Sequence, residues 1–490
     1  MSSSRYVRSR PKILLESRQW AALSFFLFSC FFVLTLPLSD DYELSLLSYL
    51  TGLLALLAVF RFRGPATVLG FLITLFVARY YFVPLLVKTI EGRSIWHNLY
   101  SPTETLSVLA CSLLAMVVAS AFFHEDMPVL GNIRTVSTLK YLRRLLVVTS
   151  IIGIAAAVQA AMRQELGPAA EVATGFLAGA GSLFDVLLTF SLSLSIYKAL
   201  AEGKSVMRSY EVIALLAANA FFALVSTSRA SVLMILVAVA VPYVLGRQRV
   251  TAPLVASILA GLLLFVFVMS PVMLYLRSGN LEFYSFSQRI GNFASFWTDT
   301  VSNPGSIAEY RTEVSAEGHY ITYFENYYGG LERFAILPDS DRLVSGTILG
   351  NQHGGWRTIS WAVAMVPPRF VYPDKPLYGP GSYLGHVAGL ASPYDTTTQW
   401  VVGFPAELYH AFSYRGVFLG TVAVLGLFFL ALKLFQVFAV DPAWKMLIAL
   451  YYWNYFPESN LAGLLSTLVP LVILVVALDR IVHYTRRWRL

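Results

Sequence analysis

Residues 461–482 read LAGLLSTLVPLVILVVALDRIV, with no charged side chain before Asp479. About 20 apolar residues are enough for a helix to cross the hydrocarbon core of a bilayer. Lipid offers no hydrogen bonds, so a crossing segment has to satisfy its own backbone, which a helix does. The whole chain has a similar character, since 57% of its 490 residues are hydrophobic and 13% are charged. The sequence therefore predicts an all-α polytopic membrane protein.

Eleven further apolar stretches are long enough to cross a membrane. The weakest of them is interrupted by Asp441, Pro442 and Lys445. With 461–482 they predict about twelve transmembrane helices; the eleven lie near 19–37, 43–60, 65–87, 102–123, 145–161, 172–197, 210–226, 230–246, 251–276, 414–437 and 439–456.

The Lys and Arg residues outside these stretches divide unevenly between the two sides of the membrane. Alternating spans place 22 of them on the side of both termini and four, among them Lys88 and Arg229, in the short loops opposite. By the positive-inside rule the richer side is cytoplasmic, which predicts a multi-spanning inner-membrane protein with both termini in the cytoplasm. The same distribution explains the net charge of +8 without nucleic-acid binding. Cys30 and Cys111 lie inside apolar stretches, which suggests core or lipid-facing thiols.

One long segment outside the membrane divides the chain into three parts. Residues 1–276 form an N-terminal bundle of about nine helices, 277–413 form a periplasmic loop domain with short helices, and 414–490 hold the last helices. The loop is rich in Tyr, Phe, Trp, Gly and Pro, unlike a disordered linker. Because loops of this size usually carry function, we expect the working surface there.

Arg229 is a candidate functional residue. It follows Ser226-Thr227-Ser228 in the tight turn between the seventh and eighth predicted helices. A charge at membrane depth is costly and is a functional candidate by default. The alternative is an interfacial arginine that reaches to lipid headgroups. The same two interpretations apply to Arg277 and Arg289, at and after the end of the ninth span.

Residues 351–381 hold the densest group of candidates. Prolines restrict the backbone here, so cationic side chains need little reordering to bind. Guanidinium groups match phosphate oxygens, and aromatic faces are surfaces on which sugars stack. These residue types suit the binding of a glycosyl pyrophosphate. The alternative is a proline-rich lid that only closes the helical bundle. The cationic candidates are His353, Arg357, Arg369 and Lys375, and the aromatic ones are Trp356, Trp361, Tyr372 and Tyr378.

Glu407 and His410 lie just before the tenth predicted span. In a helix they are neighbours on one face. The carboxylate could act as a general base on a hydroxyl or hold an arginine. Asp339-Ser340-Asp341 has the form of a metal–nucleotide-sugar site, but nucleotide sugars are absent outside the membrane. No Walker loop, dinucleotide fingerprint or zinc spacing occurs, so neither a cofactor nor a metal is expected.

A family resemblance adds to these residues. Pro368-Arg369, then Phe370-Val371-Tyr372, then Pro373-Asp374-Lys375-Pro376 resembles the hallmark of Wzy-type O-antigen and repeat-unit polymerases. Ser228-Arg229 is similar to a frequent pair in that family. The spacing of Gly403, Glu407, Tyr409, Phe412 and Gly416 is similar to its segment before a late helix, although Ser413 stands where members often have Gly.

The resemblance implies a GT-C-like glycosyltransferase that joins undecaprenyl-pyrophosphate-linked glycan units on the periplasmic side. Its partners would be those glycans, membrane lipids and a chain-length regulator. The implied catalytic set stabilises the leaving pyrophosphate through Arg229, Arg277, Arg369 and Lys375, with Glu407 or His353 as base. The implied substrate-binding set is Arg289, Trp356, Arg357, Tyr372, Tyr378, His410 and Arg415.

Three other functions fit the same spans. An O-antigen ligase shares the architecture, but the Pro-Arg…Pro-x-Lys-Pro patch favours a polymerase. A transporter would place polar residues at mid-bilayer, whereas the spans here carry few charges beyond Arg79 and Asp185. A structural subunit of an envelope complex would not need so many clustered outer cations.

Overall fold

The structure is a computed structural model of the whole chain. It describes most of the helical part and, between 266 and 333, only scattered residues. The described residues are 17–38, 41–123, 136–163, 175–226, 229–245, 252–265, 334–367, 372, 380–392, 394–395, 398, 400–438 and 443–484, with isolated positions from 269 to 324.

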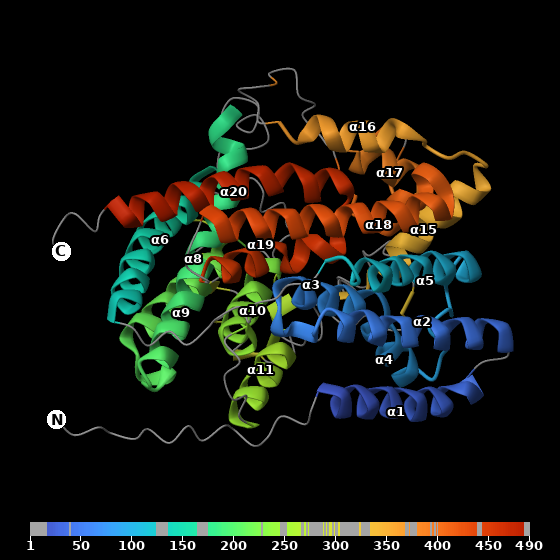
Figure 1. Cartoon of the computed structure of the whole chain (residues 1–490), viewed down its shortest axis with the longest axis horizontal. Coiled ribbons are helices and arrows are strands. Elements are labelled where there is room, and N and C mark those ends of the chain that lie inside the picture. Colours follow the sequence, from blue (N-terminus) through green and yellow to red (C-terminus); the bar gives the residue numbers. More distant parts are fainter. Residues whose placement is uncertain are drawn as a thin grey trace.

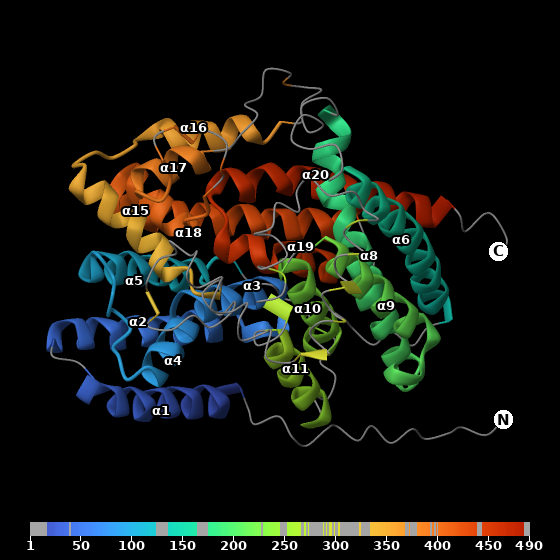
Figure 2. The ribbon, with the colours of Figure 1, turned by 180° about the vertical axis from the view of Figure 1, so that it is seen from behind.

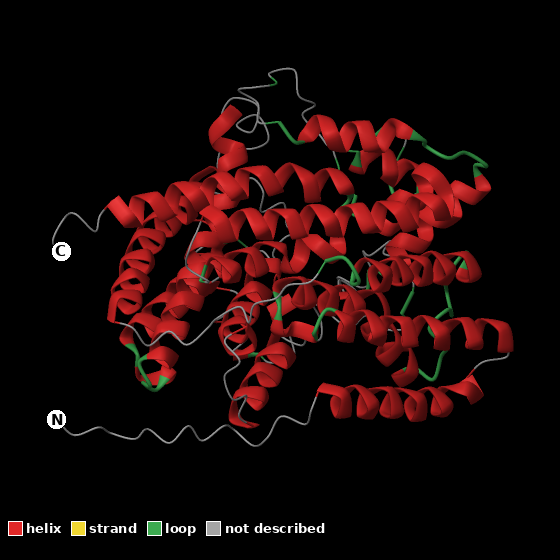
Figure 3. Ribbon diagram, viewed as in Figure 1, coloured by secondary structure: helices red, strands yellow, loops and turns green. Residues whose placement is uncertain are grey.

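Helices are the only regular elements in these described ranges (Figure 3). The N-terminal helices are α1 (Ser17–Thr35), η1 (Leu36–Leu38), α2 (Tyr42–Arg61), η2 (Gly64–Ala66), α3 (Val68–Val77), the π-helix η3 (Ala78–Phe82), α4 (Val83–Ile90) and α5 (Pro102–Ala119). The middle helices are α6 (Val136–Arg163), α8 (Gly175–Ala201), η5 (Val206–Arg208), α9 (Tyr210–Val225), α10 (Arg229–Leu245) and α11 (Ala252–Leu264). The last are α15 (Leu337–Leu349), α16 (Trp356–Met365), α17 (Gly381–Val387), α18 (Phe404–Phe438), α19 (Trp444–Glu458) and α20 (Leu461–Tyr484).

A helix lies in each of the twelve predicted apolar stretches. Within the described residues, six helical segments are long and apolar enough to cross a membrane: Tyr42–Ala66, Val68–Ile90, Pro102–Ala119, Leu139–Gln159, Phe404–Val437 and Leu461–Tyr484. Shorter apolar helices occupy Ser24–Val33, Val186–Ala201, Tyr210–Val225, Arg229–Leu245 and Leu254–Leu264. The prediction of a multi-spanning α-helical membrane protein is confirmed, and the count of twelve spans stays a prediction.

Helix α19 lies at the centre of the bundle. It packs against α3, α8, α10, α18 and α20, and most of its side chains are buried (Figures 1 and 2). This helix was the weakest of the predicted spans, with Lys445 near its start. Since protein rather than lipid surrounds α19, polar groups on it can find protein partners, as Trp444 does by donating to Asp479 (3.1 Å). The low hydropathy of this stretch therefore follows from its central position.

Helices α15, α16 and α17 gather at the end of the bundle where α18 begins (Figure 1). Helix α15 contacts α5, α17 and α18, and α16 lies along α20 and α18. All three helices belong to the segment that was predicted to lie outside the membrane. They bring the candidate residues near 350 against the beginning of α18.

Asp341 on α15 caps a helix that is remote in the sequence. Its carboxylate accepts hydrogen bonds from the backbone of Tyr100 (2.6 Å) and Ser101 (3.0 Å) and from the Thr105 hydroxyl (2.8 Å), at the first turn of α5. The N-terminus of a helix favours a negative charge and leaves N–H groups to be satisfied. Burial raises the pKa of Asp341, and these hydrogen bonds oppose that shift. The Asp339-Ser340-Asp341 motif thus contributes a helix cap.

Lys88 is fully buried in the last turn of α4, although its position in the sequence had suggested a charge in a short outer loop. It pairs with Glu91 (3.3 Å), whose side chain is also fully buried, and donates to the carbonyl of Tyr323. Asn98 donates to the same carbonyl (3.2 Å). Tyr323 belongs to the long loop, so the hydrogen bond from Lys88 anchors that loop to the N-terminal bundle.

Candidate functional site

Helix α18 is broken near its start. Phe412 (φ −143°, ψ 28°) and Ser413 (φ 56°, ψ −154°) depart from helical geometry. Such a break interrupts the ladder of N–H to C=O bonds between residues four apart, so nearby carbonyl groups need other partners. Gly416 permits the close packing at this point, because a Cβ atom there would lie 2.4 Å from the carbonyl oxygen of Leu408.

The His-Gly-Gly sequence at 353–355 supplies partners for the broken helix. Gly354 N–H donates to the carbonyl of His410 (2.8 Å), and Gly355 N–H donates to that of Ala411 (3.1 Å). Gly355 has φ +57°, which favours glycine, and a Cβ atom on Gly354 would lie 2.6 Å from His410 Nε2. The two glycines therefore join two groups of candidates that lie far apart in the sequence.

His353 is held at the same break by its ring. Its Nδ1 lies 3.2 Å from the carbonyl oxygen of Tyr409 and 3.3 Å from that of His410. A carbonyl oxygen only accepts, so Nδ1 is the protonated nitrogen. In a neutral ring Nε2 then carries the lone pair, and the side chain is exposed. His353 can therefore accept a proton at Nε2.

His410 is buried, with 1% of its surface exposed. Its Nδ1 lies 2.9 Å from the Thr347 hydroxyl, and its Nε2 lies 2.9 Å from the Tyr383 hydroxyl. The guanidinium of Arg357 lies 4.1 Å from the centre of the Tyr383 ring, a cation–π contact. We call this group the histidine cluster: Thr347, His353, Arg357, Tyr383 and His410.

Exposed side chains surround the cluster. The Trp356 ring packs against Phe412 with centroids 5.0 Å apart, and 72% of its surface remains exposed. Such an aromatic face is available for stacking on a sugar. Arg415 follows the break and is exposed. Among the remaining predicted residues, Tyr372 is exposed.

Glu407 lies one turn before His410 and contacts a different helix. Its Oε2 accepts a hydrogen bond from the backbone N–H of Leu461, the first residue of α20 (2.5 Å), and its side chain is fully buried. The other carboxylate oxygen, Oε1, is buried without a hydrogen-bond partner among the described residues. This position makes Glu407 an acceptor for the N-terminus of α20, and a catalytic role stays a prediction.

Substituting Glu407 tests that contact. In Glu407→Ala the buried N–H of Leu461 loses its acceptor, which we expect to cost about 2–3 kcal/mol. Glu407→Gln keeps one carbonyl oxygen in place and should cost clearly less. Thermal unfolding of the purified protein in detergent measures both variants. Equal losses of stability in the two variants would count against the hydrogen bond as the source of the effect.

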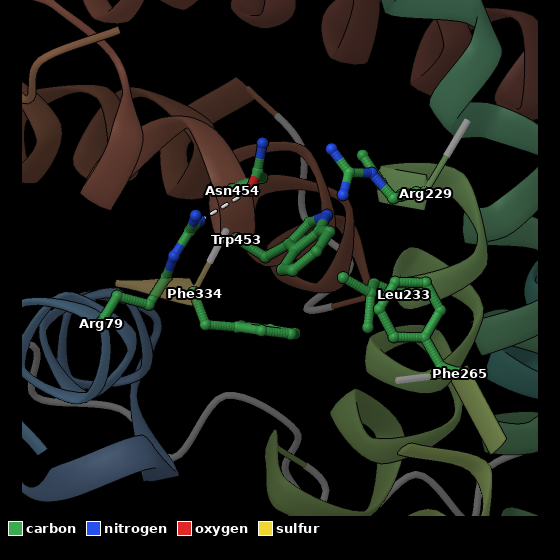
Figure 4. Close-up of a pocket in the computed structure, with 8 residues that line it drawn as sticks. Arg79, Arg229, Leu233, Phe265, Phe334, Trp453 and Asn454 are labelled. Atoms are coloured by element: carbon green, nitrogen blue, oxygen red, sulfur yellow. Dashed lines mark hydrogen bonds between the residues drawn. The ribbon is translucent and has the colours of Figure 1, made fainter. Parts of the chain in front are cut away.

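A second candidate site is a pocket between three helices that are distant in sequence, and Arg229 is the predicted residue that lines it. Arg79 from η3, Arg229 from the start of α10, and Trp453 and Asn454 from α19 contribute to it (Figure 4). The pocket is small and partly open to solvent. We call it the arginine pocket; its other lining residues are Ala230, Leu233, Phe265 and Phe334.

Arg79 is almost completely buried, with 4% of its surface exposed. Its Nη1 donates to Asn454 (2.7 Å) and lies 3.5 Å from the Glu458 carboxylate. The π-helix that carries it is a rare element that occurs often at functional sites. Arg79 was not among the predicted site residues. The signal that could have found it is its position inside an apolar span, where a charge is a functional candidate by default.

The structure brings together His353, Arg357 and His410, with Trp356 at their edge, and it places Arg229 in the arginine pocket. Thr347 and Tyr383 were missed by sequence reasoning, because neither belongs to a motif. Several predicted residues lie outside the described part of the chain: Arg277, Arg289, Arg369, Lys375, Tyr378 and the side chain of Asp185.

The comparisons with known proteins identify no relative. No protein-family model, no curated protein and no solved structure matches the chain.

Proposed function

We propose that this protein polymerises undecaprenyl-pyrophosphate-linked oligosaccharide units on the periplasmic side of the bacterial inner membrane, as the Wzy-type polymerases that its sequence resembles do. The proposal includes a GT-C-like arrangement of about twelve spans with both termini in the cytoplasm. The reaction needs no nucleotide sugar, because the lipid carrier activates the donor. A chain-length regulator is a further proposed partner.

The arginine pocket is the observation that carries the proposal. It presents the guanidinium groups of Arg79 and Arg229 beside a wall that includes Phe265, Phe334 and Trp453. A polyprenyl pyrophosphate has the matching chemistry, with a charged headgroup attached to a hydrocarbon chain. Guanidinium groups bind phosphate oxygens through paired hydrogen bonds. These bonds would strengthen as negative charge develops on the departing pyrophosphate.

The two sites lie near one end of α19. Arg79 bonds to Asn454 and pairs with Glu458 in the last turns of that helix. Glu407, one turn before His410, accepts from Leu461, just after the turn that follows α19. The predicted topology puts this end of the bundle on the periplasmic side. A donor headgroup in the arginine pocket and an acceptor sugar near the histidine cluster would therefore share one mouth of the bundle.

The roles follow from this placement. Arg229 and Arg79 would neutralise the leaving pyrophosphate, with Arg277, Arg369 and Lys375 as further cations that the resemblance implies. Arg357, Arg415 and the face of Trp356 would position sugars of the acceptor. A group of the histidine cluster would accept the proton of the attacking hydroxyl.

Deleting the gene in its own host tests the proposal. Loss of a polymerase should leave surface glycans capped with a single unit, and the intact gene on a plasmid should restore the ladder of longer chains. Polymer stranded on undecaprenyl pyrophosphate would instead indicate a ligase. Units trapped at the cytoplasmic face would indicate a transporter. Gel analysis of surface and lipid-linked glycans distinguishes these outcomes.

A further inference from the structure

Three side chains of the histidine cluster form a chain of hydrogen bonds whose direction can be read. The Thr347 hydroxyl lies 2.7 Å from the carbonyl oxygen of Leu343 and 2.9 Å from His410 Nδ1. The carbonyl can only accept, so the single hydroxyl proton of Thr347 points to Leu343. The Thr347 oxygen must then accept from His410, which makes Nδ1 the protonated nitrogen.

This assignment orients the next bond. In a neutral imidazole one nitrogen donates and the other accepts. With Nδ1 donating to Thr347, Nε2 accepts, and its partner 2.9 Å away is the Tyr383 hydroxyl. The phenolic proton of Tyr383 therefore points to His410. The lone pairs of Tyr383 Oη remain available to a group that approaches from outside.

Tyr383 can be reached, whereas His410 cannot. Tyr383 is only partly buried, and His410 is 1% exposed. The guanidinium of Arg357 lies over the Tyr383 ring, 4.1 Å from its centre. Its positive charge there would stabilise negative charge that develops on the phenol oxygen. A hydroxyl bound near Arg357 would thus meet the oxygen of Tyr383 before any atom of His410.

We propose that Tyr383 is the catalytic residue that takes the proton of the acceptor hydroxyl, with His410 behind it as the final proton acceptor. This assignment rests on the proposed polymerase function. The acceptor oxygen bonds to the anomeric carbon of the donor as the bond from that carbon to the pyrophosphate oxygen breaks. The hydroxyl proton passes to Tyr383 Oη, and the phenolic proton passes to His410 Nε2. The electron pair of the broken bond leaves with undecaprenyl pyrophosphate. The imidazolium later returns its proton to Tyr383 Oη, which releases its other proton to water.

The other two candidates for the base are placed less well for this step. Glu407 is fully buried and accepts from the backbone of α20. His353 is accessible, but its ring is tied to the carbonyls of the broken helix, where it secures the loop. His353 is therefore the competing base that the experiment has to separate from Tyr383.

The activity test uses the full-length protein in liposomes with single lipid-linked units extracted from cells that lack the gene. Tyr383→Phe keeps the ring and its contact with Arg357 but removes the hydroxyl, and we expect kcat to fall roughly 100-fold or more with little change in KM. Thr347→Val, which removes the acceptor of His410 Nδ1–H, should also lower kcat. Tyr394→Phe is the matched control, since Tyr394 is 92% exposed and outside both sites.

A second measurement reads the protonation directly. Nitrogen-15 NMR of histidine-labelled protein in lipid should show a neutral His410 with its proton on Nδ1. Tyr383→Phe should shift the Nε2 resonance, because that nitrogen loses its hydrogen bond, whereas Tyr394→Phe should leave it unchanged. A proton on Nε2, or an imidazolium in the resting protein, would contradict the direction of the chain.

The outcomes separate the assignment from the function on which it rests. If Tyr383→Phe polymerises within threefold of the wild type while His353→Gln loses activity, His353 is the base and the assignment to Tyr383 is wrong. If the wild-type protein does not extend lipid-linked units at all, the polymerase function fails, and the role of Tyr383 fails with it. In that case the NMR result still reports whether the hydrogen-bond chain exists.

Discussion

In the proposed polymerase reaction, Arg229→Ala should reduce the rate of chain growth by roughly 100- to 1,000-fold, the usual effect of removing one preorganised donor from a site of developing negative charge. Arg229 is the first residue of α10 and lines a pocket with Arg79 and aromatic side chains. In such surroundings its interaction with a phosphate is screened less than in water. Arg229→Lys should recover part of the rate, because Lys keeps the charge but lacks the planar fork. The initial rate in liposomes, measured with lipid-linked units, gives both values.

The control for this experiment is Arg208→Ala, which removes an exposed arginine of η5. Its rate should match the wild type. If Arg229 merely anchors α10 to lipid headgroups, Arg229→Ala should lower thermal stability and leave the rate of the folded protein within threefold of normal. That result would remove the arginine pocket from the reaction.

Lys88→Ala should destabilise the protein by about 3–5 kcal/mol, the usual cost of removing one partner of a buried ion pair. The side chains of Lys88 and Glu91 are both fully buried, and Lys88 also donates to the carbonyl of Tyr323. Its loss leaves a buried carboxylate without this cation and frees the point at which the long loop meets α4. Thermal unfolding in detergent, and protease cleavage of the loop near Tyr323, should both show the change.

An exposed pair of the same residue types provides the comparison. Lys204 pairs with Glu202 (2.6 Å), but 69% of the Lys204 side chain is exposed. Exposed pairs are screened by water, so Lys204→Ala should barely change the melting temperature. The double variant Lys88→Met, Glu91→Gln should recover part of the stability lost in Lys88→Ala, because it removes the uncompensated charge. A single Lys88→Ala variant as stable as Lys204→Ala would contradict a buried pair.

Sequence reasoning succeeded where one stretch of chain is enough to decide the structure. Every predicted apolar stretch contains a helix, since apolar composition and backbone hydrogen bonding act locally. Sequence reasoning was less informative where the neighbouring helices decide whether a residue is buried. The stretch of α19 was the weakest predicted span, because polar residues count against a helix that faces lipid, whereas α19 is surrounded by protein. Lys88 was assigned to a loop, although its charge is compensated by Glu91 inside the protein.

The sites show the same division more sharply. His353, Arg357 and His410 were predicted from their chemistry, but nothing in the sequence states that residues 353–355 dock on a break in α18. Tyr383 and Thr347 lie 27 and 63 residues from His410, and no spacing rule connects them. Arg79 and Arg229 line one pocket only because η3, α10 and α19 come together.

The sequence alone determined that this chain is a helical membrane protein, because apolar length and the cost of unsatisfied backbone in lipid are properties of single segments. It also determined which residue types are available for binding a phosphate or moving a proton. Only the tertiary structure decided which of them lie together. The reason is that side-chain hydrogen bonds act over about 3 Å, so their partners depend on which helix faces meet.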